Sequence, residues 1–464
     1  MFRSIRNVLV LGCVLLVSSC VSNPPYSVPV MPVPVTLDPV FTDHMVLQRG
    51  MPVHVWGKAN PGEPLKVLFA GQMVRTLADT SGNWSAMLSP MKASAESRKL
   101  VVQGHNEVSI EDVLVGEVWL CSGQSNMEWG LLGVSSGRKD CDAANLPLIR
   151  LYSVEKREAT KPQTVFNGVK GWLGCSPQNL EKVGTDRNSF SATAFYFGRD
   201  LQARLGVPVG LIQSAWGGTR IEPWTPQEKS GPDGGRLYNA MIAPITPMTL
   251  RGAIWYQGES NLGDKGAYEQ KMKDMIGAWR TVFQRPDMPF YFVEIAPYRY
   301  GQAEALGELR AAQARVAATV PHTGMIHTLD NPNDLGNIHP DNKVQIGSRL
   351  ARLALAGTYG IKSGKSVVGP VFTMAKRVEN GIQLRFKDTA GALITTDGKA
   401  PEGFEAQVSG SWVKATATLQ GDKILVRMPG QTVAAIRFCW NETDQTNLRN
   451  TEGLPPSPFS VAVP

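Results

Sequence analysis

A buried-strand pattern that ends in a polar turn constrains the fold of this chain more than any other feature. Residues 113–121 form an apolar run rich in β-branched and aromatic side chains, and a Ser-Gly pair ends it. Such a run is typical of a strand that is covered on both faces in a parallel sheet. The polar residues Gln124, Ser125 and Asn126 follow at once. Open α/β sheets bind ligands just beyond the carboxyl ends of their strands, so this turn is a candidate site.

Two interpretations of Ser125 follow from its surroundings. Gly123 permits a tight backbone turn that would project the Ser125 hydroxyl from the edge of the sheet. A serine at such a place also commonly caps the next helix without any catalytic role. The rest of the chain must distinguish a nucleophile from a cap.

The segment that follows alternates between strands and helices. Apolar residues at helical spacing predict helices at 191–205 and 340–356, which end at Gly206 and Gly357. Further runs typical of buried strands lie at 209–213, 252–256 and 290–295. This alternation predicts an α/β fold with a parallel sheet in a three-layer domain.

The flanking segments have the period-two pattern of β structure, and 464 residues are too many for one core. We therefore predict five parts of the chain. They are a signal peptide at 1–20, a Pro-rich tether at 21–40, an N-terminal β-sandwich at 41–112, the α/β domain at 113–362 and a C-terminal β domain at 363–464.

The N-terminus resembles an export signal. Two arginines precede the apolar segment 8–17, which is too short to span a bilayer. The sequence Val-Ser-Ser-Cys at 17–20 resembles the lipobox of bacterial lipoproteins, so we expect Cys20 to be lipidated. An ordinary secretory signal cleaved nearby is the alternative. We expect an exported protein, periplasmic or anchored to the outer membrane by lipid.

Composition excludes several other classes. The formal charge of +7 is modest for this length, and no basic run with interleaved aromatics indicates nucleic-acid binding. Neither a Gly-rich phosphate loop nor a cluster of metal ligands is present, so we expect no cofactor and no metal. Cys141 and Cys175 are the first pair to test for a disulfide in an oxidising compartment, although buried free thiols are equally compatible.

Four short blocks carry the chemical signal. They are Gly-Gln-Ser-Asn-Met at 123–127, Trp-Gly-Gly-Thr at 216–219, Trp-Tyr-Gln-Gly-Glu-Ser-Asn at 255–261 and Ile-His-Pro at 338–340. In this order and context, the chain resembles the sialate O-acetylesterase-type carbohydrate esterases of the SGNH hydrolase superfamily. The resemblance implies an SGNH-hydrolase-like, flavodoxin-like central domain between the two β domains.

The resemblance also implies roles for individual residues. Ser125 would be the nucleophile and His339 its general base, because an attacking hydroxyl must lose its proton and imidazole can take it at neutral pH. Donors to the oxyanion would be the Ser125 amide, an amide of Gly217 or Gly218, and the side chain of Gln257, with Asn261 as second choice. Substrate-binding or supporting roles are expected for Gln124, Asn126, Arg220, Glu259 and Asn261.

The group that orients His339 is a departure from the superfamily pattern. Much of the superfamily has Asp three residues before the histidine, where this chain has Gly336. Asp334 and Asp330 are the nearest upstream carboxylates. Either Asp334 completes a triad, or the site is a Ser-His dyad steadied by a backbone carbonyl; only a carboxylate would also stabilise imidazolium.

We therefore expect a serine esterase that removes O-acetyl groups from sialic acid or a related sugar. Arg220 is a possible partner for the sialate carboxylate, but the sequence Arg-Ile-Glu at 220–222 also fits an internal ion pair. One alternative is an acetylesterase acting on xylan or xyloglucan. Another is a carbohydrate-binding protein without activity, against which intact Ser125 and His339 argue.

The lipobox generates a first test. Metabolic labelling with palmitate should tag the wild-type protein and leave the Cys20→Ser variant untagged, because only the Cys20 thiol would carry the lipid. Recovery of an unlabelled wild-type protein cut at another residue would contradict the lipoprotein assignment.

Overall fold

Strand β8 (Glu107–Gly123) runs through two regions of the chain. Its first part pairs antiparallel with β7 (Ser94–Gln103) and parallel with β2 (Val46–Gln48). Its second part lies between β11 (Val209–Ala215) and β12 (Gly252–Tyr256), parallel to both. A single strand thus pairs first with strands of the N-terminal β region and then with strands of the central sheet.

The domain boundary expected between residues 112 and 113 falls inside β8. Asp112 has a φ of 54° at this position. Its carboxylate accepts hydrogen bonds from Arg150 at 2.6 Å and His44 at 2.7 Å. The strand continues past Asp112, because β7 still pairs with Val113 and Val115 and β2 pairs with residues 114–116.

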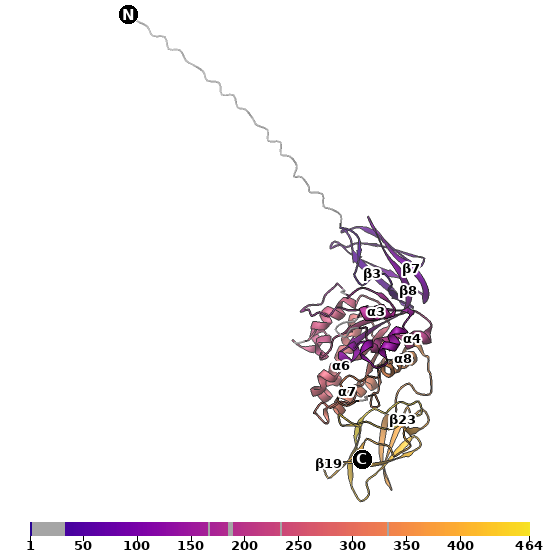
Figure 1. Cartoon of the computed structure of the whole chain (residues 1–464). Coiled ribbons are helices and arrows are strands. Elements are labelled where there is room, and N and C mark those ends of the chain that lie inside the picture. Colours follow the sequence, from indigo (N-terminus) through magenta and orange to yellow (C-terminus); the bar gives the residue numbers. More distant parts are fainter. Residues whose placement is uncertain (2–32, 166–167, 184–188, 233, 332–333) are drawn as a thin grey trace. The chain divides into compact units, whose positions relative to one another are not determined.

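The computed structural model describes residues 1, 33–165, 168–183, 189–232, 234–331 and 334–464 (Figure 1). Residues 2–20 of the predicted signal peptide, Cys20 among them, lie outside these residues. Residues 34–464 form one compact unit.

The central sheet is a run of parallel strands. Beyond β8, β11 and β12 it contains β9 (Leu146–Ser153), β13 (Phe290–Val293), β14 (Thr323–Ile326) and the antiparallel edge strand β10 (Leu173–Cys175). The strand order is β10-β9-β11-β8-β12-β13-β14. If β9 is left out and β8 is counted first, the strands β11-β8-β12-β13-β14 have the order 2-1-3-4-5 that flavodoxin-like sheets show. The chain leaves β8 in both directions, so ligands are expected at its carboxyl end.

Two pairs of helices pack against this sheet (Figure 1). One pair is α4 (Ala192–Leu205) with α8 (Lys343–Tyr359), and the other is α6 (Tyr268–Val282) with α7 (Ala305–Thr319). The mixed α/β class expected from the sequence is therefore observed, with these four helices beside a largely parallel sheet.

Helix α8 begins and ends later than predicted. Asn342 caps its first turn, and Gly360, with a φ of 67°, ends it in place of Gly357. Gly357 lies inside the helix. Glycine fits this position because a Cβ there would come within 2.4 Å of the Tyr291 hydroxyl. This glycine permits close packing of α8 on the sheet and does not terminate the helix.

The N-terminal β region begins earlier than the predicted tether allowed. Val35 and Val40 are 1% exposed, and β1 (Thr36–Leu37) pairs with β3 (Val53–Lys58). The last residues of the expected 21–40 tether therefore belong to the fold. The remaining strands of this region are β4 (Pro64–Phe69), β5 (Gln72–Leu77) and β6 (Asn83–Leu88).

The C-terminal region is β structure with its own apolar core. One sheet has the order β15-β16-β21-β20, a second has β19-β18-β22-β24, and β17 pairs with β23. Their bounds are β15 Val371–Val378, β16 Gly381–Lys387, β17 Leu393–Thr395, β18 Phe404–Val408, β19 Ser411–Lys414, β20 Thr416–Gln420, β21 Lys423–Arg427, β22 Val433–Phe438, β23 Leu448–Asn450 and β24 Phe459–Ala462.

Short helices occupy the connections. Those of α type are α1 (Ser125–Glu128), α2 (Gly137–Asp142), α3 (Pro177–Lys182) and α5 (Gln227–Ser230). The others are η1 (Leu131–Gly133), η2 (Glu222–Trp224), η3 (Tyr238–Ile242), η4 (Ala243–Ile245) and η5 (Glu259–Ala267). Within the described ranges, no helix has the length and hydropathy needed to cross a membrane.

All four cysteines in the described part of the chain are free and buried: Cys121, Cys141, Cys175 and Cys439. The disulfide considered for Cys141 and Cys175 is therefore not formed. Burial raises the pKa of the Cys175 thiol to about 12, and the Cys141 thiol donates to the carbonyl of Pro177 at 3.7 Å. Both thiols behave as small apolar groups of the interior.

Candidate active site

The turn after β8 requires glycine at position 123. Gly123 has a φ of 141°, and a Cβ there would lie 2.2 Å from the carbonyl oxygen of Tyr256. The next amide, that of Gln124, donates to the same carbonyl at 3.0 Å. β8 and β12 thus meet without an intervening side chain, and the chain turns directly into α1 at Ser125.

The turn brings Ser125 to His339. The Ser125 Oγ lies 2.9 Å from His339 Nε2, within hydrogen-bond distance, although 214 residues separate them in sequence. The imidazole stacks on Trp129, with ring centroids 4.1 Å apart and planes inclined by 23°. The His339 backbone amide donates to Asn337 Oδ1 at 2.9 Å. The ring and the backbone of His339 are thus both held in place. The contact between Ser125 Oγ and His339 Nε2 has the geometry of a nucleophile and its base.

Neither upstream aspartate contacts the imidazole. Asp334 is exposed, and its carboxylate accepts from the Gly336 amide at 2.7 Å, which closes its own loop. Asp330 is buried and forms a two-point ion pair with Arg349, at 2.9 and 2.7 Å. The structure therefore does not bring the expected third member, Asp334, to His339.

The glycine block lies beside the serine. A Cβ on Gly217 would lie 3.2 Å from Ser125 Cβ. The Gly217 amide, however, donates to Glu128 Oε2 at 2.7 Å, and Lys156 pairs with the other oxygen of this carboxylate at 2.5 Å. Of the two expected glycine donors, Gly217 is thus engaged, whereas the amide of Gly218 meets no acceptor within the described structure.

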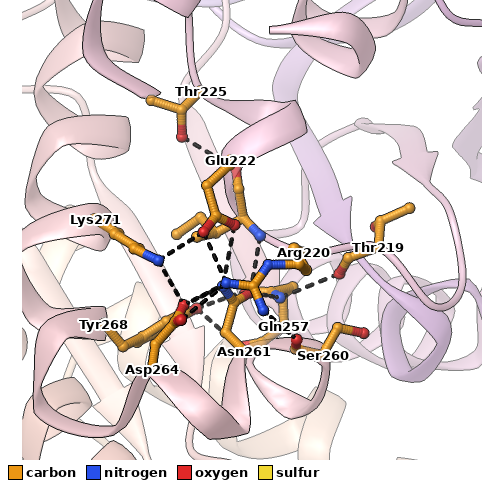
Figure 2. Close-up of polar contacts among 11 residues, drawn as sticks. Thr219, Arg220, Glu222, Thr225, Gln257, Ser260, Asn261, Asp264, Tyr268 and Lys271 are labelled. Atoms are coloured by element: carbon orange, nitrogen blue, oxygen red, sulfur yellow. Dashed lines mark hydrogen bonds and ion pairs between the residues drawn. The ribbon is translucent and has the colours of Figure 1, made fainter. Parts of the chain in front are cut away.

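The side-chain amides expected to face the oxyanion lie elsewhere. The Gln257 Nε2 donates to Asn261 Oδ1 at 2.6 Å and to the Thr219 carbonyl at 3.2 Å, while its Oε1 accepts from Tyr268 (Figure 2). Asn261 in turn donates to Glu222 and Asp264. Gln257 and Asn261 therefore brace the loop after β12 and do not point to Ser125.

Arg220 belongs to the same network. Its guanidinium pairs with Glu222 at 2.9 Å and Asp264 at 2.8 Å, and Lys271 bonds the same two carboxylates (Figure 2). Burial favours a raised pKa for Glu222, but hydrogen bonds from Arg220, Lys271 and Asn261 outweigh it and hold this pKa at about 2. The four charges cancel, so the internal ion pair of the two sequence interpretations is the one observed.

Three further polar side chains connect the serine turn to its surroundings. Gln124 Oε1 accepts from the amides of Gly258 and Ser260, both at 3.3 Å. The Asn126 Nδ2 donates to Glu259 Oε1 at 2.5 Å. Gln124, Asn126 and Glu259, expected to bind substrate or support the site, are all buried and all hold protein groups.

Sequence reasoning missed Lys343 and Glu128. Lys343 is fully buried at the start of α8 and donates to Asn126 Oδ1. Its spacing from Ile346 and Leu350 places it on the apolar face of that helix, which is the signal that could have found it. Glu128 follows Ser125 by three residues, which places it one helical turn away.

No group of three or more potential metal-ligating side chains occurs among the residues that the structure describes.

Comparison with known proteins adds three findings. Residues 115–356 match the model of a family described as carbohydrate esterase, sialic acid-specific acetylesterase. The chain is 31% identical to the sialate O-acetylesterase of Homo sapiens over 91% of each chain, and 27% identical to that of Mus musculus over 90% of this chain and 93% of the relative. It also resembles the crystal structure of a carbohydrate acetylesterase from Xanthomonas citri, with a TM-score of 0.86, 34% identity and coverage of 92% and 99% of the two chains.

Proposed function

The chain belongs to the sialic acid-specific acetylesterase family of carbohydrate esterases, and from this we propose that it hydrolyses sugar acetyl esters through an acetyl-Ser125 intermediate. The observation that carries the proposal is the 2.9 Å contact between Ser125 Oγ and His339 Nε2 at the carboxyl end of β8. A serine that only capped α1 would not need a histidine at this distance.

In the first half of the reaction, Ser125 Oγ attacks the acetyl carbonyl while His339 Nε2 takes the hydroxyl proton. The tetrahedral intermediate collapses as the bond to the sugar oxygen breaks, and His339 returns the proton to that oxygen. Water then attacks acetyl-Ser125, His339 takes a proton from it, and acetate leaves as Ser125 regains its hydrogen. Stacking on Trp129 holds the imidazole ring in place during both halves.

Two backbone amides are suited to the charge on the carbonyl oxygen. The Ser125 amide opens α1, before the helical hydrogen bonds begin, and neither it nor the Gly218 amide meets an acceptor within the described structure. We assign the oxyanion hole to these two groups. Each such donor is worth on the order of 3 kcal/mol to the transition state.

We propose that Asp334 is not the group that orients His339. The Asp334 carboxylate is exposed and accepts from the Gly336 amide, and neither a hydrogen bond nor an ion pair joins it to the imidazole. Stacking on Trp129 and the hydrogen bond to Asn337 already hold the histidine in place.

The proposal includes the architecture and location expected from the sequence. The flavodoxin-like strand order and the two helix pairs support a three-layer SGNH-type domain between β-rich regions. We also propose that the protein is exported as a lipoprotein that carries its lipid on Cys20. This part of the proposal rests only on the lipobox-like sequence of residues 17–20.

For the substrate, we propose an O-acetylated sugar, either sialic acid or a related sugar such as those of xylan or xyloglucan. The Arg220 charge is compensated by Glu222 and Asp264, so it does not by itself select an acidic sugar. The names of the relatives, sialate O-acetylesterase and carbohydrate acetylesterase, fit both kinds of sugar.

The nucleophile is tested by Ser125→Ala. We expect acetate release from a chromogenic acetyl ester to fall by on the order of 10³-fold or more, with the fold intact by circular dichroism. His339→Ala should lose a similar factor, and the double variant little more, because the two residues act as one unit. Retention of more than about a tenth of the activity in Ser125→Ala, a barrier change below roughly 1.4 kcal/mol, would reject this serine.

The absence of Asp334 from the mechanism is tested by Asp334→Asn. Since the carboxylate only closes its own loop, kcat should fall by less than about tenfold, or about 1.4 kcal/mol. Loss of a catalytic aspartate would cost roughly 10⁴-fold in kcat, as it does for the aspartate of a serine-protease triad. A loss of that size would show that Asp334 reaches the imidazole during turnover.

The role of Arg220 is tested by assaying Arg220→Ala on O-acetylated sialic acid and on acetylated xylan side by side. Because exposed ion pairs are worth roughly 0–1 kcal/mol, kcat/KM should change by a similar factor on both substrates, within about fivefold of wild type. A loss above about tenfold on sialic acid alone would instead identify Arg220 as the carboxylate partner.

A further inference from the structure

One buried amide joins the three segments that build the Ser-His pair. Asn126 follows Ser125, and its Nδ2 donates to the carbonyl of Ile338 at 3.1 Å, the residue directly before His339. The same nitrogen donates to Glu259 Oε1 at 2.5 Å, on the loop after β12. Asn126 therefore lies one residue from the nucleophile and bonds the residue next to the base.

This amide is held between two opposite charges. Lys343, at the start of α8, donates to Asn126 Oδ1, the oxygen opposite the nitrogen that bonds Glu259. The Lys343 ammonium also lies 5.2 Å from the ring centroid of Tyr256. A cation on the carbonyl oxygen and a carboxylate on the amide nitrogen fix which way the Asn126 amide points, because the reverse orientation would oppose both contacts.

Neither charge is solvated. Lys343 is 0% exposed and Glu259 is 8% exposed. Burial lowers the pKa of Lys343 to about 7, against the fields of Glu259 and Asp341. Burial raises the pKa of Glu259, against hydrogen bonds that include the one from Asn126. Removal of one partner would leave the other buried without compensation, which is far more costly than removal of both.

Asn126 bonds residues on both sides of His339. The Ile338 carbonyl precedes His339 by one peptide unit, and Lys343 follows it by four residues, so both ends of the histidine loop are tied to Asn126. We propose that Lys343 and Glu259 are positioning residues, which act through Asn126 to hold His339 Nε2 at hydrogen-bond distance from Ser125 Oγ. This inference rests on the serine mechanism proposed above.

The test measures the nucleophile directly. A fluorophosphonate probe forms a bond between phosphorus and Ser125 Oγ and releases fluoride, and its rate reports how well His339 activates the serine without any sugar substrate. Lys343→Met, Glu259→Gln and the double variant are compared with Lys273→Met, which removes a lysine that pairs with Glu269 on the surface of α6. The folded fraction is measured in parallel, and rates are expressed per folded molecule.

We expect each single variant to react between about 10- and 100-fold more slowly, because displacement of a catalytic group by about 1 Å can cost on the order of 10²-fold. The same factor should appear in kcat on an acetyl ester with KM little changed. The double variant should react faster than either single variant, since it buries no lone charge and the neutral amide introduced by Glu259→Gln still offers an acceptor to Asn126. Lys273→Met should match wild type.

Three outcomes would overturn the inference: single variants that match wild type per folded molecule, losses that simply multiply in the double variant, or losses confined to KM. If Lys343→Met does not fold, Glu259→Gln and the double variant still decide the question. A wild-type protein that labels at Ser125 but releases no acetate would refute the proposed function and leave this inference standing.

Discussion

The close approach of two main chains, at Gly123 and Tyr256, is the constraint on which the candidate site depends. A single carbonyl of β12 accepts the amide that follows Gly123, and any side chain at position 123 would collide with it. Because β8 and β12 are this close, the turn into α1 begins beside the loop that carries Glu259. The serine, its neighbour Asn126 and that loop are therefore brought together by backbone packing before any side chain contributes.

Local features of the sequence predicted the parts that depend on local structure. The strands around the site and helix α4 lie where the apolar runs and glycine signals indicated, because such patterns reflect burial and turns directly. The ends of α8 were displaced because Gly357 serves packing against Tyr291, which a single-chain pattern does not reveal. β8 runs across the predicted boundary between residues 112 and 113, because one strand pairs first with β7 and then with β11 and β12.

Side-chain direction was the part that the sequence could not supply. The resemblance implies Gln257 as an oxyanion donor, yet its side-chain amide bonds Asn261 and Tyr268. The sequence leaves Asp334 as a candidate third member of a triad, but its carboxylate accepts from the Gly336 amide of its own loop. The sequence alone did not indicate Lys343 or Glu128, because their partners Asn126 and Gly217 are distant in sequence.

The continuity of β8 also bears on how this protein can be divided. A strand that supplies hydrogen bonds to β7 and β2 and then to β11 and β12 cannot be cut at residue 112 without leaving backbone groups at the cut unpaired. The N-terminal β region is thus not an exchangeable module that evolution or an engineer could swap between catalytic domains. Heat or denaturant should melt it together with the central sheet, as one cooperative unit.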